Sequence, residues 1–162
     1  MELQRCQQRK KCLLDSLTKA HLSTRAILNE VNLEIPIHKE TGWRARDILG
    51  HIATWNREVA KSLRAHQTGF KYLIPDLDEE EVEFNEKAVL EQKKLSIQQI
   101  LYEFERAYDK LWLAVADIPT DRFPGDILFP WGDEHGSIVE LVEYMIEHVV
   151  EHRDETTIAL KK

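Results

Sequence analysis

Helical periodicity is the feature of this sequence that most restricts the fold. Four long segments carry apolar residues three or four positions apart, which is the spacing of one face of an α-helix. In the first segment Leu13, Leu17 and Ala20 follow this spacing. The pattern predicts long helices over residues 2–31, 43–69, 96–119 and 137–160, and a short helix over residues 84–94.

Helix starts and turn residues support the same interpretation. Ser96 precedes Gln99, and Ser137 precedes Glu140, at the spacing of a capping box, in which two side chains satisfy free amides at a helix N-terminus. The 162 residues include only 6 glycines and 5 prolines, which is low for a turn-rich β architecture, and no segment resembles a strand. We therefore predict a single all-α domain over residues 1–162, folded as a four-helix bundle.

Charge and apolar content limit the partners of the chain. Lys and Arg total 22 and Asp and Glu total 29, so the net charge is −7 and a phosphate backbone would be repelled. No apolar run approaches the ~18 residues of a membrane span. The first residues, MELQRCQQRKK, lack the apolar core of a secretory signal, and Cys6 and Cys12 make no disulfide framework. We expect a cytoplasmic protein that binds neither nucleic acid nor membrane.

The placement of the histidines points to a metal site. His148 and His152 are four residues apart in the last predicted helix, so their side chains lie on one face. Leu141 and Met145 precede them on the same stripe, which directs both imidazoles towards the core. Two imidazoles at this spacing can chelate one divalent ion.

His51 shows the same inward placement in the second predicted helix. It shares a face with Ile48 and Trp55. Each buried imidazole needs a polar partner, and one shared ion would satisfy His51 together with the pair in the last helix. Three neutral nitrogens with one open position form the ligand set of catalytic zinc sites, and nickel accepts the same donors. We therefore predict a zinc or nickel site at His51, His148 and His152.

Two alternatives to a catalytic ion stay open at this point. The three histidines can be core residues that bond to other polar groups without a metal. A carboxylate can also close the coordination shell and make the site structural. Glu155, three residues after His152, is the candidate for that position.

Further residues are assigned to the surroundings of this site. Trp55, Trp131 and Tyr144 either line a pocket above the ion or pack in the core. Asn56 and Glu58 either orient the ligands or are solvated. The other histidines are expected outside the ligand set. His135 lies in the loop before the last helix and could reach the entrance of the site. The surface is the expected place of His21, His38 and His66.

Several of these segments resemble a known family. They are GWRARDILGHIATWN over residues 42–56, Phe84-Asn85, FPWG over residues 129–132 and EHVVEH over residues 147–152. Together they resemble the DinB-like superfamily of four-helix bundles, and within it the ClbS/DfsB family. The resemblance covers essentially the whole chain.

The resemblance implies a fold, a ligand set and a range of activities. It implies an up-down-down-up bundle, a long crossover over residues 70–94 between the second and third long helices, and a homodimer. It also implies a metal triad that falls on His51, His148 and His152. Similar proteins transfer thiols such as bacillithiol, mycothiol or glutathione, or hydrolyse a cyclopropane electrophile.

We therefore predict a metal-dependent hydrolase or thiol-dependent transferase. It would act on small electrophiles in detoxification or self-resistance, with a low-molecular-weight thiol as a further cofactor. The alternative is a non-catalytic small-ligand-binding or stress-response protein whose histidine site is structural or empty.

Overall fold

Helices make up most of the chain in the computed structural model, which describes residues 1–161. The elements are α1 (Glu2–Asn29), α2 (Ala45–Gln67), α3 (Val82–Gln92), α4 (Ile97–Ala116), β1 (Asp126–Leu128), β2 (His135–Ser137) and α5 (Ile138–Leu160). The predicted all-α class is confirmed, with four long helices and one short one. None of the helices in this part of the chain has the length and apolarity of a membrane span.

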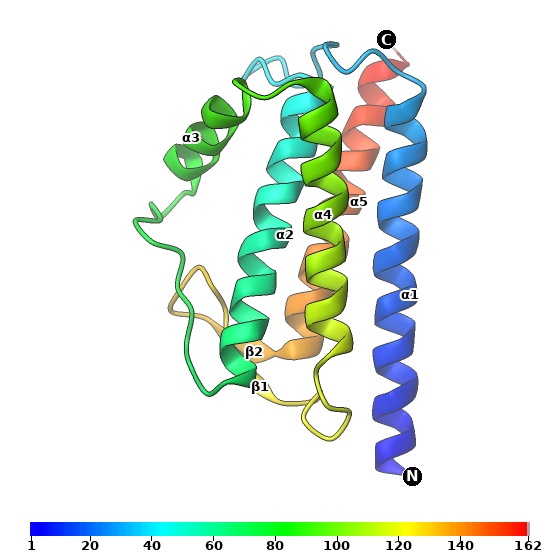
Figure 1. Cartoon of the computed structure of the whole chain (residues 1–162), viewed down its shortest axis with the longest axis vertical. Coiled ribbons are helices and arrows are strands. Elements are labelled where there is room, and N and C mark those ends of the chain that lie inside the picture. Colours follow the sequence, from blue (N-terminus) through cyan, green and yellow to red (C-terminus); the bar gives the residue numbers. More distant parts are fainter. Residues whose placement is uncertain (162) are drawn as a thin grey trace.

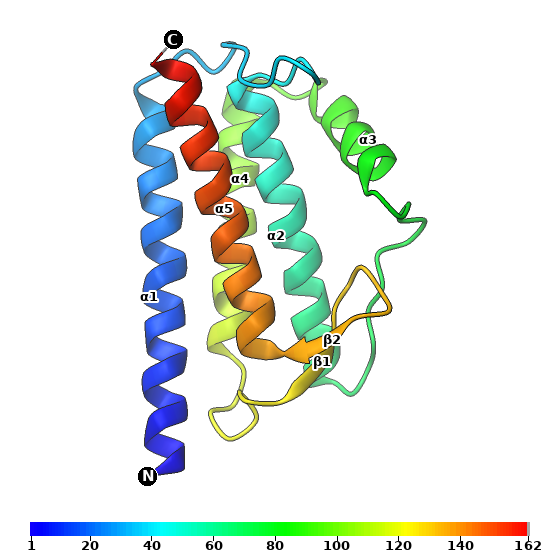
Figure 2. The same ribbon diagram turned by 180° about the vertical axis from the view of Figure 1, so that it is seen from behind.

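The four long helices lie along one common direction (Figures 1 and 2). Helices α1 and α5 run one way, whereas α2 and α4 run the other way. Helix α3 lies outside this group, beside α2, on the chain segment that returns from the end of α2 to the start of α4. This return segment contains the crossover expected over residues 70–94.

Helix α2 is the most deeply buried element, because α3, α4 and α5 all contact it. Its apolar side chains include Ile52 and Val59, which are fully buried, and α4 contributes Phe104 and Leu111 to the same interior. Burying one such side chain contributes about 1.5–3 kcal/mol to folding. A histidine on α2 is therefore placed next to the core by the packing of its neighbours.

The predicted capping boxes at the starts of α4 and α5 are confirmed. The amide of Gln99 donates to Ser96 Oγ at 3.1 Å, and Gln99 Oε1 accepts from the Ser96 amide at 2.8 Å. Ser137 and Glu140 repeat this exchange at 3.0 and 2.6 Å. The second box fixes where α5 begins and hence the register of its histidines.

Helix α2 begins two residues later than the periodicity predicts. The Asp47 carboxylate accepts a hydrogen bond from the Arg44 amide at 2.8 Å, which makes Arg44 the residue before the first turn. The amides of Ala45 and Arg46 donate to carbonyls of the preceding loop, at Ile35 and Leu33. Trp43 therefore belongs to the loop rather than to the helix.

The expectation of no strand was wrong. Strands β1 and β2 form an antiparallel hairpin in which Ile127 is paired with Gly136. Ile127 and Phe129 are buried against the end of the bundle, and a Cβ atom at Gly136 would collide with the Phe129 ring. Strands of three residues are too short to show alternation in a sequence. The hairpin matters here because it carries Trp131 at its loop, beside the site.

Candidate metal centre

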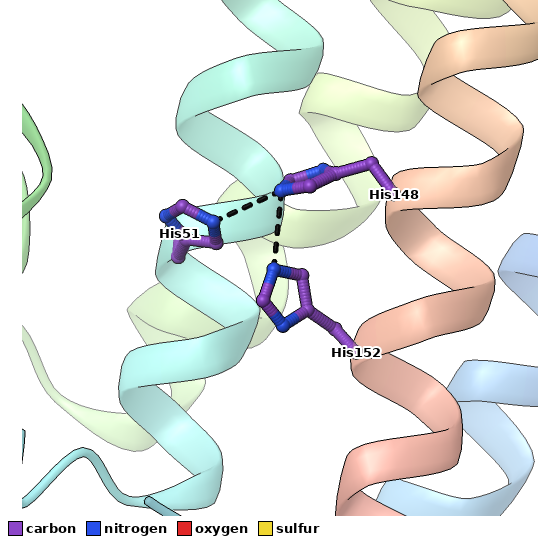
Figure 3. Close-up of side chains that lie close together, drawn as sticks. All are labelled: His51, His148 and His152. Carbon is purple, nitrogen blue, oxygen red and sulfur yellow. Dashed lines mark hydrogen bonds between the residues drawn. The ribbon is translucent and has the colours of Figure 1, made fainter. Parts of the chain in front are cut away.

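The structure brings His51, His148 and His152 together between α2 and α5 (Figure 3). The Nε2 atom of His148 lies 2.9 Å from Nε2 of His51 and 3.1 Å from Nε2 of His152. Two of the rings come from successive turns of α5, and the third comes from the facing surface of α2. Three nitrogen atoms therefore converge on one small region.

Burial keeps these rings neutral. It lowers the pKa of His148 to about 3, with a further contribution from His152. It also lowers the pKa of His51, to which both neighbouring imidazoles add, and the pKa of His152. A neutral imidazole has one nitrogen with a free lone pair, and this is the form that binds metal ions.

Hydrogen bonds alone do not satisfy all the ring nitrogen atoms of this cluster. Each neutral ring has a single N–H, whereas Nε2 of His148 faces two other Nε2 atoms. The buried Nδ1 atom of His148 has no hydrogen-bond partner among residues 1–161. The three Nε2 atoms cannot all be satisfied by one another, and buried polar atoms without partners cost free energy, so the arrangement indicates a group that interacts with all three Nε2 atoms.

The donors fit a divalent ion in number, type and spacing. Nitrogen ligands ~2.0–2.1 Å from a tetrahedral zinc ion lie about 3.4 Å from one another. The observed separations of 2.9 and 3.1 Å require only a small outward movement of the rings. Imidazole donors suit both zinc and nickel.

Glu155 supports the cluster from the far side of His152. Its Oε2 atom lies 2.9 Å from His152 Nδ1 and 2.9 Å from His38 Nε2. Although burial raises the pKa of Glu155, the hydrogen bonds from both imidazoles lower it below its usual value. A carboxylate acceptor holds the proton on Nδ1 of His152, so the lone pair is on Nε2. Glu155 therefore does not occupy a ligand position at the Nε2 atoms.

A cavity of about 710 Å³ opens over the three histidines. Trp55, Trp131 and Tyr144 line it, as do Glu81, Asn85, Glu134, Met145, Glu147 and Glu151. Trp55 is buried and its Nε1–H donates to Asn85 Oδ1 at 2.9 Å, which ties α2 to α3. Tyr144 is 54% exposed, so core packing is the wrong interpretation for this ring.

Other expectations near the site need correction. Asn56 and Glu58 are buried rather than solvated. Asn56 is not part of the cavity lining, and Glu58 accepts hydrogen bonds from Tyr72 and Lys61. Both residues lie in the part of α2 that is buried by neighbouring elements.

Two of the remaining histidines, His21 and His38, differ from the expected surface position. His21 is buried, stacked on Tyr108 with ring centroids 3.9 Å apart, because α1 packs against α4. His38 is half-buried and bonds to Glu155. His135 is exposed and lies beside Asp126, outside the histidine cavity. His38 was missed because it lies in a loop, where no periodicity indicates which way a side chain points.

The comparison with known families agrees with this architecture. The family model described as the DinB superfamily matches residues 2–155. The chain belongs to the DinB superfamily. The narrower resemblance to the ClbS/DfsB family stays a prediction. No curated protein matches this sequence.

A solved structure shares the fold of this DinB-superfamily protein. It is the crystal structure of a mycothiol-dependent maleylpyruvate isomerase, with a TM-score of 0.74 and 15% sequence identity. The match covers 91% of this chain but only 60% of the isomerase. At this identity the similarity establishes the fold and leaves the activity to other evidence.

Proposed function

We propose that this protein is a metal-dependent enzyme that acts on small electrophiles, with a divalent ion held by His51, His148 and His152. The observation that carries the proposal is the convergence of three Nε2 atoms at an open cavity. Among residues 1–161 no carboxylate or thiol joins this group as a fourth ligand. Such a shell leaves a position for a reacting molecule, as in catalytic zinc sites.

The chemistry follows from the donors and the cavity. A divalent ion at this position would supply Lewis acidity, which lowers the pKa of water or a thiol enough to give a nucleophile at neutral pH. Glu155 holds His152 in the tautomer that leaves Nε2 free. Trp55, Trp131 and Tyr144 give the cavity an apolar wall for the carbon skeleton of a substrate.

The nucleophile decides whether the reaction is a hydrolysis or a transfer. Addition of water or of a thiol to an epoxide forms a new bond to carbon and breaks the C–O bond, and the proton passes to the released oxygen. The fold shared with a mycothiol-dependent enzyme supports a low-molecular-weight thiol as cosubstrate. Detoxification or self-resistance is the corresponding role.

Turnover assays with defined nucleophiles test this proposal. Zinc-loaded and nickel-loaded protein would be incubated with an epoxide and with a conjugate acceptor, each with water alone or with mycothiol, bacillithiol or glutathione. We expect consumption of electrophile that requires the metal and is lost in His148→Ala. Equal rates for loaded and chelator-treated protein in every combination would contradict the proposal and favour the non-catalytic alternative.

The homodimer expected from the resemblance stays a prediction. Light scattering on the purified protein would measure the mass against 19.0 kDa for one chain.

A further inference from the structure

The histidine cavity is lined by acidic groups of one sign. Four glutamates belong to its lining, and none of the chain's 22 Lys and Arg residues does. These glutamates are Glu81, Glu134, Glu147 and Glu151. A cleft lined by one sign of charge focuses the field and concentrates ligands of the opposite sign. The cavity therefore favours cations and disfavours anions.

Three aromatic rings line the same cavity as these carboxylates. The ring centroid of Trp131 lies 5.4 Å from Tyr144 and 6.4 Å from Trp55, and the ring planes are inclined by 53° and 66°. Inclined rings form a curved wall rather than a flat stack. The Nε1–H of Trp131 donates to Glu134 Oε2 at 2.6 Å, which joins the wall to the carboxylates. Aromatic faces of this kind attract ammonium groups through their quadrupole.

The same cavity also contains the three converging histidines, so the glutamates and aromatic rings surround a candidate binding site. Three Nε2 atoms converge there. A divalent ion bound there would leave the four carboxylates in excess.

We propose that the molecule bound in this cavity carries a positively charged group, such as a protonated or quaternary amine. This group lies against Trp131 and Tyr144, and Glu147 supplies opposite charge. The inference rests on the proposed function only in naming the substrate class of that same site. In an enzyme of the proposed type, the substrate is an electrophile that also bears an amine.

Three probes of the same shape and different charge test the inference. They are choline, its uncharged analogue 3,3-dimethylbutan-1-ol, and the anion 3,3-dimethylbutanoate. Isothermal titration at low ionic strength would compare them on zinc-loaded and chelator-treated protein. We expect choline to bind at least about tenfold more tightly than the alcohol in both forms. In the chelator-treated protein, where no ion can ligate a carboxylate, we expect the anion to bind most weakly.

Variants test whether the preference for choline over the alcohol arises in the cavity. Glu147→Gln and Tyr144→Leu each reduce the preference for choline severalfold. The matched controls Glu30→Gln and Tyr102→Leu, at exposed positions outside the cavity lining, leave it unchanged. Equal binding of choline and the alcohol in both forms of the protein would overturn the inference, as would equal effects of cavity and control variants.

Zinc content measured on the same samples separates this inference from the proposed function. A choline preference in protein that takes up no zinc supports the cation site and contradicts the metal-dependent enzyme. Zinc uptake without a choline preference supports the metal centre and overturns the cation site.

Discussion

The Glu155 carboxylate lies 2.9 Å from Nδ1 of His152, while Nε2 of the same ring faces His148 at 3.1 Å. One ring thus connects a fixed acceptor to the group of converging nitrogens. The same carboxylate oxygen lies 2.9 Å from Nε2 of His38, which comes from the loop before α2. The orientation of His152 therefore depends on a loop that contributes none of the three Nε2 atoms.

Removing the charge of Glu155 should weaken metal binding without removing a ligand. Glu155→Gln keeps the shape of the side chain but loses the charged acceptor for His152, and we expect a loss of about tenfold in zinc affinity. Competition with a zinc-binding dye would measure this loss. Asp154→Asn, at an exposed neighbouring position, is the matched control. An unchanged affinity in Glu155→Gln would show that Glu155 does not position His152.

Acid should destabilise the metal-free protein through its buried imidazoles. Burial lowers the pKa of His148 to about 3, whereas an imidazole in an unfolded chain has a pKa of ~6.5. Between these values the unfolded chain binds a proton that the folded protein does not, so the free energy of unfolding falls as the pH falls. From about pH 7 to about pH 5 we expect a loss of about 2 kcal/mol from His148 alone.

Urea unfolding with a chelator present at these two pH values would measure the loss. His148→Leu should remove about that much of the pH dependence. The same pH dependence in wild type and His148→Leu would refute the attribution to His148.

Gly50→Ala should have opposite effects on the free energy of unfolding in the wild type and in the Gln92→Ala variant. A Cβ atom at Gly50 would collide with Gln92, whose Nε2 atom donates to Gly50 O at 3.0 Å and to Thr54 Oγ1 at 2.9 Å. Gly50→Ala should therefore displace the Gln92 amide and break both hydrogen bonds. After the helix gain of alanine is subtracted, we expect the free energy of unfolding to fall by about 0.5–2 kcal/mol. In a Gln92→Ala background the same change should raise it by up to about 1 kcal/mol, because alanine favours the helix.

Chemical unfolding of the four proteins in this double-mutant cycle would measure both effects. The sign of the Gly50→Ala effect is the decisive quantity. The same sign in both backgrounds would show that Gln92 is not what excludes a side chain from position 50.

The long helices were predictable because each combines apolar periodicity with a local start signal. Ser96 with Gln99 and Ser137 with Glu140 are such signals, and both form as expected. The start of α2 was missed by two residues because the residue before its first turn is Arg44, which is not one of the residue types that usually cap a helix. The hairpin was missed because its register depends on Ile127 and its neighbours packing against the finished bundle.

The three histidines were predictable because their helical faces could be inferred from spacing alone. Spacing did not predict the residues that surround the site. His38 reaches Glu155 from a loop, and His21 is buried because α1 packs against α4, which is a tertiary contact. Glu81 and Glu134 come from other loops, so their place at the cavity depends on the path of the chain.

Metal content would show directly whether His51, His148 and His152 hold an ion. Tag-free wild type, His51→Ala, His148→Ala and the exposed control His135→Ala would be reconstituted with zinc or nickel, dialysed and assayed by elemental analysis. We expect about one ion per chain in wild type and in His135→Ala, and none retained in the other two variants. A wild-type protein that holds no ion, or a His148→Ala protein that keeps one per chain, would contradict this expectation.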